Sequence, residues 1–404
     1  MTNLEKWRYY TRFLFSPDTF IDYGWYYIVS AALQRRVWYG EMTGDPLFPN
    51  LYIVFVGDAG VGKGLVLGKA SELLRHHTYA NDNPVDKVIA RKFLFPPGPD
   101  DLTYEKLCEK LSKSTQWFKH VNGEGKKVAY GHASMSFVLE EMGSLFKRRH
   151  DDSLNKLFLK CYDCKEHEYE TKHQGEHAIK KPCLALLAGC TPDFLPKCVY
   201  HGILEDGTLS RMIFIYEYEP RLTSFFLGQP GKDENKCKDE LLDYIKILST
   251  LYGSVSLAAD VEPFLENWYK TVWTVKVRRC HPKMRTYFAR SRVHILKLAM
   301  ACHFSENLDM TLTLEDCQKA LDLLERIEPK MSMCLAATGR NENAKLTKEI
   351  LRYITNKPEG ASLADLMDYF QTETAFPELK QMLEDLAIMG KITTREGLYY
   401  DTTR

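Results

Sequence analysis

The chain has 404 residues, 45% hydrophobic and 27% charged, which is ordinary for a globular protein of two or three domains. Its 54 basic and 54 acidic side chains cancel, which excludes a strongly basic nucleic-acid binder, so any such binding needs local basic loops. Eleven irregularly spaced cysteines and the absence of a secretory leader pattern favour a reducing cytoplasm over a disulfide framework.

Residues 1–45 predict a helical, aromatic-rich N-terminal segment. The apolar run Phe20–Leu33 within it contains Asp22 and ends just before two arginines. Such a run is too short to cross a bilayer, so we expect a buried helix and no membrane contact. The sequence DPLFPN at residues 45–50 then breaks the chain.

Residues 46–235 predict strands that alternate with amphipathic helices. The five expected strands are Tyr52–Val56, Val88–Phe95, Ser136–Glu141, Cys183–Gly189 and Ser210–Tyr216. Continuous apolar strands separated by helices predict an α/β fold with a parallel sheet covered on both faces. Residues 236–337 predict a mainly helical lid.

Residues 344–404 follow a polar break at 338–343 and predict a winged helix, because three helices precede two short strands. The helices are expected at 344–357, 362–371 and 377–389, with Ser362 as an N-cap, and the strands at 391–396 and 397–402. Winged helices bind duplex DNA or mediate protein contacts. The acidic residues of the third helix, Glu378, Glu384 and Asp385, disfavour reading of a major groove.

The sequence GDAGVGK at residues 57–63 matches the phosphate-binding pattern G-x-x-x-x-G-K between a predicted strand and a predicted helix. Glycines let backbone N–H groups turn toward phosphate oxygens, and Lys63 would bridge the β- and γ-phosphates. We expect the nucleotide to contact Gly57, Asp58, Ala59, Gly60, Val61, Gly62, Lys63, Gly64 and Leu65. Gly64 stands where Ser or Thr would hold Mg²⁺, so water or an acidic side chain must replace that hydroxyl.

Polar residues also follow the next apolar strands. Glu140 and Glu141 end the predicted strand 136–141 in a Walker B arrangement, so Glu140 is expected to hold Mg²⁺ and Glu141 to orient or deprotonate water. Alternatively, both are solvated carboxylates at a helix start. Thr191 follows another strand, where it could touch the γ-phosphate, and Arg211 opens the strand after that.

The order of these motifs resembles that of AAA+ ATPases, and residues 20–337 are similar to the MCM-like replicative helicases of phages and mobile genetic elements. The run LSRMIFI is similar to the Ser-Arg-Phe motif of MCM helicases, whose arginine enters the site of the neighbouring subunit. The resemblance implies sensor 1 at Thr191, an arginine finger at Arg211, and sensor 2 at Arg290 rather than Arg292.

The same resemblance implies the partners of the protein. It predicts a homo-hexamer in a bacterial cytoplasm that uses ATP and Mg²⁺ to move along single-stranded or forked DNA. The sequence has no evident primase motif, so a primase or initiator would be a separate chain.

Two predicted hairpins carry basic residues. They are His167–Pro182, turning at Gln174-Gly175, and Gln116–His132, turning at Asn122-Gly123. The resemblance implies that they are the pre-sensor hairpin and the helix-2 insert, which face a central pore. The expected DNA-contacting residues are Lys119, Lys126, Lys127, Lys172, His173, His177, Lys180 and Lys181. The alternative is a pair of solvated surface hairpins.

Other functions stay open. Gly64 favours a weakly hydrolysing AAA+ module, an origin-binding initiator or helicase loader that acts as a nucleotide-dependent assembly switch. A small-molecule kinase is disfavoured by Arg211 and the hairpins. The spacing of Cys161, Cys164 and His167 also suits zinc, but no second cysteine pair of that spacing lies nearby.

Overall fold

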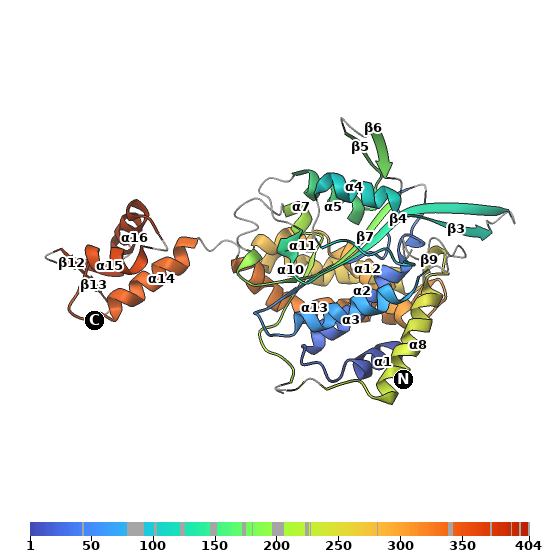
Figure 1. Cartoon of the computed structure of the whole chain (residues 1–404), viewed down its shortest axis with the longest axis horizontal. Coiled ribbons are helices and arrows are strands. Elements are labelled where there is room, and N and C mark those ends of the chain that lie inside the picture. The colour runs from blue at the N-terminus through green and yellow to red at the C-terminus, as the bar shows by residue number, and fades with distance from the viewer. Residues whose placement is uncertain are drawn as a thin grey trace, which may run out of the picture. The chain divides into compact units, whose positions relative to one another are not determined.

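The protein is described by a computed structural model, which divides into two compact units, Met1–Thr338 and Gly339–Arg404 (Figure 1). The boundary between them falls within the polar break seen in the sequence. The structure describes all residues except 43, 79–92, 101–102, 122–125, 146–151, 172–174, 180, 196–205, 223–225, 227, 281, 338–341, 372–373, 389, 396 and 403–404.

The larger unit contains a five-stranded sheet of order β3-β4-β7-β2-β8. Its strands are β2 (Tyr52–Val56), β3 (Thr115–Val121), β4 (Lys127–Leu139), β7 (Pro182–Cys190) and β8 (Ile213–Tyr216). Strands β4, β7, β2 and β8 are parallel, and β3 runs antiparallel to β4. The prediction of a parallel sheet is therefore confirmed for these four strands.

Strands β4 and β8 begin at residues other than those predicted. Strand β4 begins at Lys127 rather than Ser136, because its first half pairs with β3 in a hairpin. Strand β8 begins at Ile213, so Arg211 lies in the turn before it. Most of the predicted strand 88–95 lies outside the described residues, but Pro97 forms a parallel bridge with Ser136.

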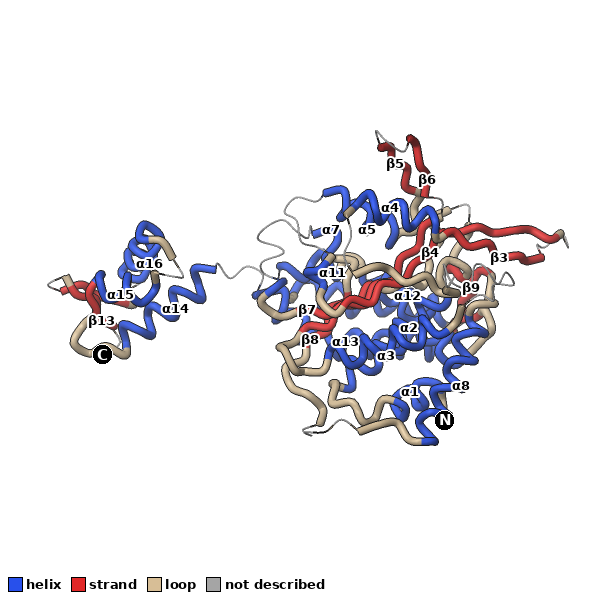
Figure 2. The backbone as a smooth tube through the Cα atoms, in the orientation of Figure 1, coloured by secondary structure: helices blue, strands red, loops and turns tan. Residues whose placement is uncertain are grey.

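Helices cover both faces of the sheet (Figure 2), and two side chains of β2 illustrate this. Tyr52 and Phe55 are three positions apart, so their side chains point to opposite faces. The Tyr52 ring lies 5.9 Å from that of Phe158 in α5 (Asp152–Tyr162). The Phe55 ring stacks 4.5 Å from that of Phe20 in α2 (Asp18–Leu33). The prediction of a doubly covered sheet is confirmed.

Helix α2 is buried along nearly its whole length, as expected for the apolar run at its centre. Its buried carboxylate, Asp22, lies 2.8 Å from Arg8 Nε in α1 (Asn3–Tyr10) and 3.1 Å from Arg326 Nη2 in α13 (Leu314–Ala337). A buried charge requires such partners. Within the described residues, no helix combines the length and apolarity needed to cross a membrane.

Several shorter elements complete the α/β part. They are α3 (Lys63–His76), α4 (Tyr104–Lys113), η2 (Met142–Ser144), β5 (His167–Thr171), β6 (Gly175–Ile179) and α7 (Asp206–Leu209). Helix α3 follows the glycine-rich loop at residues 57–62 and packs beside α2.

The rest of this unit is mainly helical. It comprises α8 (Lys232–Leu248), α9 (Val261–Trp268), the π-helical η3 (Tyr269–Trp273), α10 (Thr274–Arg279), η4 (Pro282–Met284), α11 (Arg285–Phe288), α12 (Ser291–Glu306) and α13. The prediction missed a parallel sheet in which β9 (Gly253–Leu257) lies between β1 (Val37–Tyr39) and β10 (Thr311–Leu312). Strands as short as β1 and β10 leave no periodic signal.

The smaller unit contains α14 (Glu342–Thr355), α15 (Leu363–Phe370) and α16 (Phe376–Ile388), with a sheet of order β11-β13-β12. Its strands are β11 (Ala361–Ser362), β12 (Ile392–Arg395) and β13 (Leu398–Asp401). The predicted N-cap is confirmed, since Ser362 Oγ accepts a 3.1 Å bond from the Asp365 amide. Apart from β11, the elements follow the predicted order.

Candidate functional site

The loop between β2 and α3 has a backbone that glycine adopts without strain. Gly60 has a φ of +88° and Gly62 a φ of +97°. A Cβ at Gly62 would lie 2.9 Å from Ser16 Cα and Oγ, and Ser16 Oγ donates a 2.7 Å hydrogen bond to the Gly62 carbonyl. Ser16 therefore fixes the loop at the position where α3 begins.

Lys63 is the first residue of α3 and curls back over the loop. Its side chain is 8% exposed, and its ammonium donates to the carbonyls of Gly57 and, at 2.9 Å, Asp58. A Cβ at Gly57 would lie 2.5 Å from the carbonyl oxygen of Glu217, the residue after β8. The loop thus packs closely against the end of β8, and the Lys63 ammonium lies at the N-terminus of α3.

Thr191 lies beside this loop because β7 is the parallel neighbour of β2. Val56 pairs with Cys190 in register, and the Gly57 amide donates a 3.2 Å hydrogen bond to the Cys190 carbonyl. The next residues of the two strands, Gly57 and Thr191, therefore leave the sheet side by side.

Glu140 and Glu141 reach the same edge from β4. Leu139 pairs with Ala188 of β7, and a Cβ at Gly189 would lie 2.2 Å from the Glu140 carbonyl oxygen. Both carboxylates are exposed and make no hydrogen bond or ion pair with the described part of the chain. The carboxyl edge of the sheet, the usual ligand position in open α/β folds, thus collects the loop, the threonine and two free acids.

These residues fit a magnesium nucleotide. The loop offers backbone amides and the Lys63 charge to phosphates, while Glu140 offers oxygens to a hard cation. A Cβ at Gly64 would meet no atom within 4 Å, so the position that usually carries a hydroxyl is open rather than filled.

The zinc hypothesis finds no support among the described residues, where no three His, Cys, Asp or Glu side chains come together as a metal site. Cys161 and Cys164 are buried, and His167 Nε2 lies 2.7 Å from the Tyr104 hydroxyl.

Arg211 lies at the opposite edge of the sheet, because it precedes β8. Its Nη2 is 2.6 Å from Asp163 Oδ2, and its Nη1 donates a 2.8 Å bond to the Gly207 carbonyl. Arg290 approaches the same carboxylate at 4.0 Å and donates from Nε to Ser210 Oγ at 3.1 Å. Burial and the nearby Arg211 charge lower the pKa of Arg290.

Both arginines line a cavity of about 810 Å³. Its charged lining comprises five basic side chains, Arg35, Lys165, Arg211, Arg290 and Lys297, and three acidic ones, Asp45, Asp163 and Glu166. Lys297 is almost wholly buried and donates to Asn50 Oδ1 at 2.6 Å, and burial lowers its pKa to about 8. The surplus of positive charge makes this cavity favourable for an anion.

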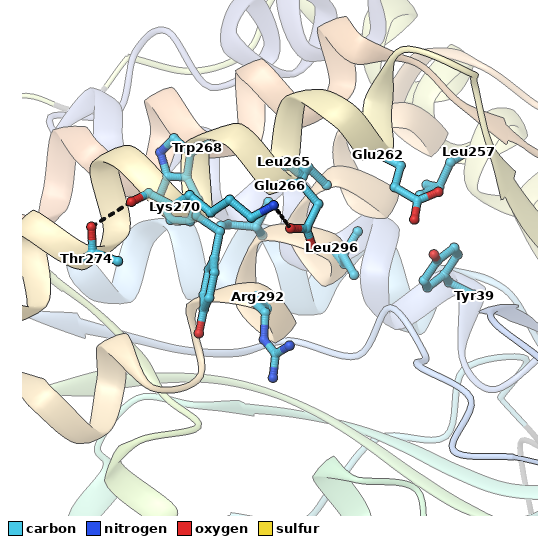
Figure 3. A pocket seen from close by; sticks show the side chains of 12 residues that line it. Tyr39, Leu257, Glu262, Leu265, Glu266, Trp268, Lys270, Thr274, Arg292 and Leu296 are labelled. Carbon is cyan, nitrogen blue, oxygen red and sulfur yellow. Dashed lines mark hydrogen bonds and ion pairs between the residues drawn. The ribbon is translucent and has the colours of Figure 1, made fainter.

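Arg292 belongs to a different cavity of about 560 Å³ (Figure 3). Its guanidinium lies 5.5 Å from the centre of the Tyr269 ring, and α9 contributes Leu265 and Trp268 to the same lining. Of the two candidates for sensor 2, Arg290 is therefore the one that joins Arg211.

His294 supports the turn before Arg211. It is fully buried, its Nε2 lies 2.9 Å from the Ser210 carbonyl, and burial lowers its pKa to about 4. Between pH 4 and 6.5, His294 is therefore protonated in the unfolded chain but neutral in the folded protein. The resulting stabilisation is present above pH 6.5 and is lost as the pH falls toward 4, by up to about 3 kcal/mol.

We expect His294→Gln to show a smaller fall in melting temperature than the wild type between pH 6.5 and 4.5, measured by scanning fluorimetry. His303 is the matched control. Burial opposes its protonation, but the hydrogen bond to Asp316 raises its pKa overall. His303→Gln should therefore steepen the acid loss, and identical slopes for both variants and the wild type would contradict the assignment.

Both predicted hairpins are present. Strand β5 pairs with β6 so that Thr171 lies opposite Gly175. Gly175 therefore opens the second strand rather than lying in the predicted turn, and the other residue of that turn, Gln174, lies outside the described residues. Strands β3 and β4 form the other hairpin, whose predicted turn lies outside the described residues.

The predicted DNA-contacting residues differ in their surroundings. Lys119 and Lys126 are exposed on the β3–β4 hairpin. Lys181 is half-buried with its Nζ 4.3 Å from the Tyr130 ring centre, so it packs against the protein, and burial lowers its pKa. The remaining positions lie outside the described residues, wholly for Lys172, His173 and Lys180 and in their side chains for Lys127 and His177.

Sequence reasoning missed two residues that shape the sites. Asp163, which orients both arginines, lies between Cys161 and Cys164. An acidic residue inside the CYDC motif was the only local feature that could have indicated it. Ser16 lies 46 positions before the glycine it holds, so no local pattern could have indicated it.

The chain matches no protein-family model, and no curated protein matches it. The assignment of a function therefore depends on the residues themselves, which form a phosphate loop with two acids at one edge of the sheet and an arginine pair at the other.

Proposed function

We propose that the protein is an AAA+ ATPase that assembles into a hexameric ring and moves along single-stranded DNA as an MCM-like replicative helicase. One observation carries the proposal. The phosphate loop and acids lie at the carboxyl edge of the sheet, whereas Arg211 and Arg290 lie at its amino edge. One copy cannot bring both sets to one nucleotide, but a head-to-tail contact between copies can, and such contacts form a ring when the rotation between copies closes.

In this proposal, one copy supplies the nucleotide-binding half of the site. Lys63 would bind phosphate oxygens, and Glu140 would hold Mg²⁺, with water in place of the missing hydroxyl. Glu141 accepts a proton from the attacking water, while Thr191 orients that water from the adjacent strand. When bound, Mg²⁺ would neutralise part of the phosphate charge.

The next copy supplies the cations. Arg211 is held by Asp163 and Arg290 by Ser210, so both guanidiniums are oriented before a neighbour arrives. Their shared carboxylate neutralises only one of the two charges. The unbalanced cation can stabilise the charge that develops on a transferred phosphoryl group.

The sheet order supports the AAA+ assignment, because β7 with Thr191 lies between the phosphate strand β2 and the acid strand β4. We interpret the smaller unit as a winged helix, since three helices are followed by an antiparallel strand pair. The exposed Glu378 and Glu384 on its third helix favour a contact other than a DNA groove.

Gly64→Ser should restore the missing metal ligand without strain, because the space around its Cβ is empty. We expect the half-saturating Mg²⁺ concentration for ATP hydrolysis to fall roughly tenfold, as for one added contact to a charged group. Gly64→Ala is the matched control, since it adds the Cβ without the hydroxyl. An equal effect of both substitutions would show that the hydroxyl position does not face the metal.

The test of the proposal is a comparison of ATP hydrolysis with and without single-stranded DNA, combined with strand separation on a forked duplex. DNA-stimulated hydrolysis with unwinding is the expected result. Nucleotide-dependent assembly without unwinding would instead favour an initiator or loader, which the glycine at position 64 also suits. Transfer of phosphate to a small acceptor without any DNA response would contradict both.

A further inference from the structure

The β3–β4 hairpin extends from the edge of the sheet and has two unlike faces (Figure 1). On one face, Phe118 stacks 5.4 Å from Tyr252, and Tyr130 lies 5.4 Å from the same ring, so this face packs against the protein. Side chains alternate along a strand, which places Trp117 and Lys119 on the other face. Both are exposed, and the Trp117 side chain is 70% exposed.

Trp117 lies flat on its own hairpin. It pairs in register with Gly131, and a Cβ at that glycine would lie 2.9 to 3.1 Å from three carbons of the indole ring. The indole therefore covers the glycine with one side and turns its other side to solvent. Lys119 pairs with the small, exposed Ala129, so no bulky neighbour rises opposite the lysine.

An indole fixed in this way differs from an exposed tryptophan on a mobile loop. Its inner side is supported by backbone, and its open side is a planar surface of the size of a nucleobase. Lys119 lies two residues further along the same face, and the exposed Lys126 immediately precedes the return strand β4, so positive charge accompanies the flat ring. Aromatic platforms flanked by cations bind single-stranded nucleic acid by stacking bases and attracting phosphates.

We propose that Trp117 stacks on a base of single-stranded nucleic acid while the lysines of the same hairpin contact its phosphates. The inference rests on the proposed function, in which this hairpin meets DNA, and adds the mode of contact. Base stacking requires no sequence preference, which suits a protein that moves along a strand.

The full-length protein should be tested for binding to a labelled oligo-dT and to an abasic oligomer of equal length, which keeps the phosphates and lacks the bases. We expect Trp117→Ala to weaken binding of oligo-dT about 5- to 150-fold, the usual range for one stacked base, and Trp117→Phe to retain most of it. Binding of the abasic oligomer should not change. Lys119→Ala should weaken binding of both.

One control variant, Val128→Ala, and the pattern of outcomes for Trp117→Ala and Lys119→Ala distinguish the possible failures. Val128→Ala removes an exposed apolar side chain on the opposite face of the same hairpin and should change nothing. If Trp117→Ala leaves oligo-dT binding intact while Lys119→Ala weakens it, the stacking inference is overturned and the proposed function stands. If the wild type binds neither oligomer, both are overturned. If Trp117→Ala instead disrupts self-association, the ring belongs to an interface between copies and the inference fails.

Fluorescence gives an independent readout. Trp7, Trp25, Trp38 and Trp268 are at most 9% exposed and Trp273 is half-buried, which leaves Trp117 as the most exposed of the six tryptophans. Oligo-dT should quench a solvent-exposed component of the emission that is missing in Trp117→Phe. Equal quenching in the two proteins would contradict the inference.

Discussion

Lys63→Ala is expected to abolish nucleotide binding and to lower ATP turnover by at least about a hundredfold, as for the loss of one preorganised charge at a phosphoryl group. Lys63 is the cation held over the phosphate loop, and its place at the start of α3 combines its charge with that of the helix end. Titration with a fluorescent ATP analogue and a phosphate-release assay would measure the two effects.

Glu141→Gln is the matched control for this variant. It keeps the shape of the side chain and removes the proton acceptor, so we expect turnover to be lost and nucleotide binding to be retained. If Lys63→Ala bound nucleotide as well as Glu141→Gln does, the loop would not be the phosphate site. The central assignment would then fail.

Arg211→Ala is expected to lower turnover about 10³- to 10⁵-fold, the range for loss of an arginine finger, while nucleotide binding is retained. The reason is geometric, because Arg211 lies at the edge of the sheet away from the phosphate loop of its own chain. In the proposed function, it would therefore act on a nucleotide bound by another copy. Steady-state hydrolysis and nucleotide titration on the purified variant would separate the two effects.

Arg292→Ala is the control for Arg211→Ala. Arg292 belongs to the cavity beside Tyr269 and not to the one that holds Arg211 and Arg290. Turnover should therefore stay close to the wild-type value. A loss larger than that of Arg211→Ala would show that the wrong arginine has been assigned.

Local features of the fold were predictable because their signals lie within a few residues. Tyr52–Val56 is an unbroken apolar run before glycines, and Ser362 precedes an acidic residue at the capping distance, so β2 and the start of α15 follow from sequence. The parallel register then places Thr191 beside Gly57 once both strands are assigned. The position of the glycine-rich loop and Thr191 at the carboxyl edge of the sheet could therefore be predicted from the sequence pattern, while their role stays a prediction.

The meeting of Arg211 and Arg290 at the amino edge of the sheet could not be predicted from the sequence in the same way. Arg211 comes from a turn before β8 and Arg290 from the start of α12, and they meet because both approach Asp163 and Arg290 also donates to Ser210. No short-range pattern connects three such distant residues. The sheet of β1, β9 and β10 was missed because β1 and β10 are too short to leave a periodic signal. The flat packing of Trp117 on Gly131 likewise depends on register across a hairpin.

Mixing two inactive variants tests most directly whether each site is shared between copies. Arg211→Ala retains an intact phosphate loop and Glu141, while Glu141→Gln retains an intact arginine. In rings assembled at random from equal amounts, about a quarter of the interfaces would join an intact loop to an intact arginine. We predict that mixing restores up to that fraction of wild-type ATP hydrolysis. If both variants assemble together and the mixture stays as inactive as its components, the shared site is contradicted.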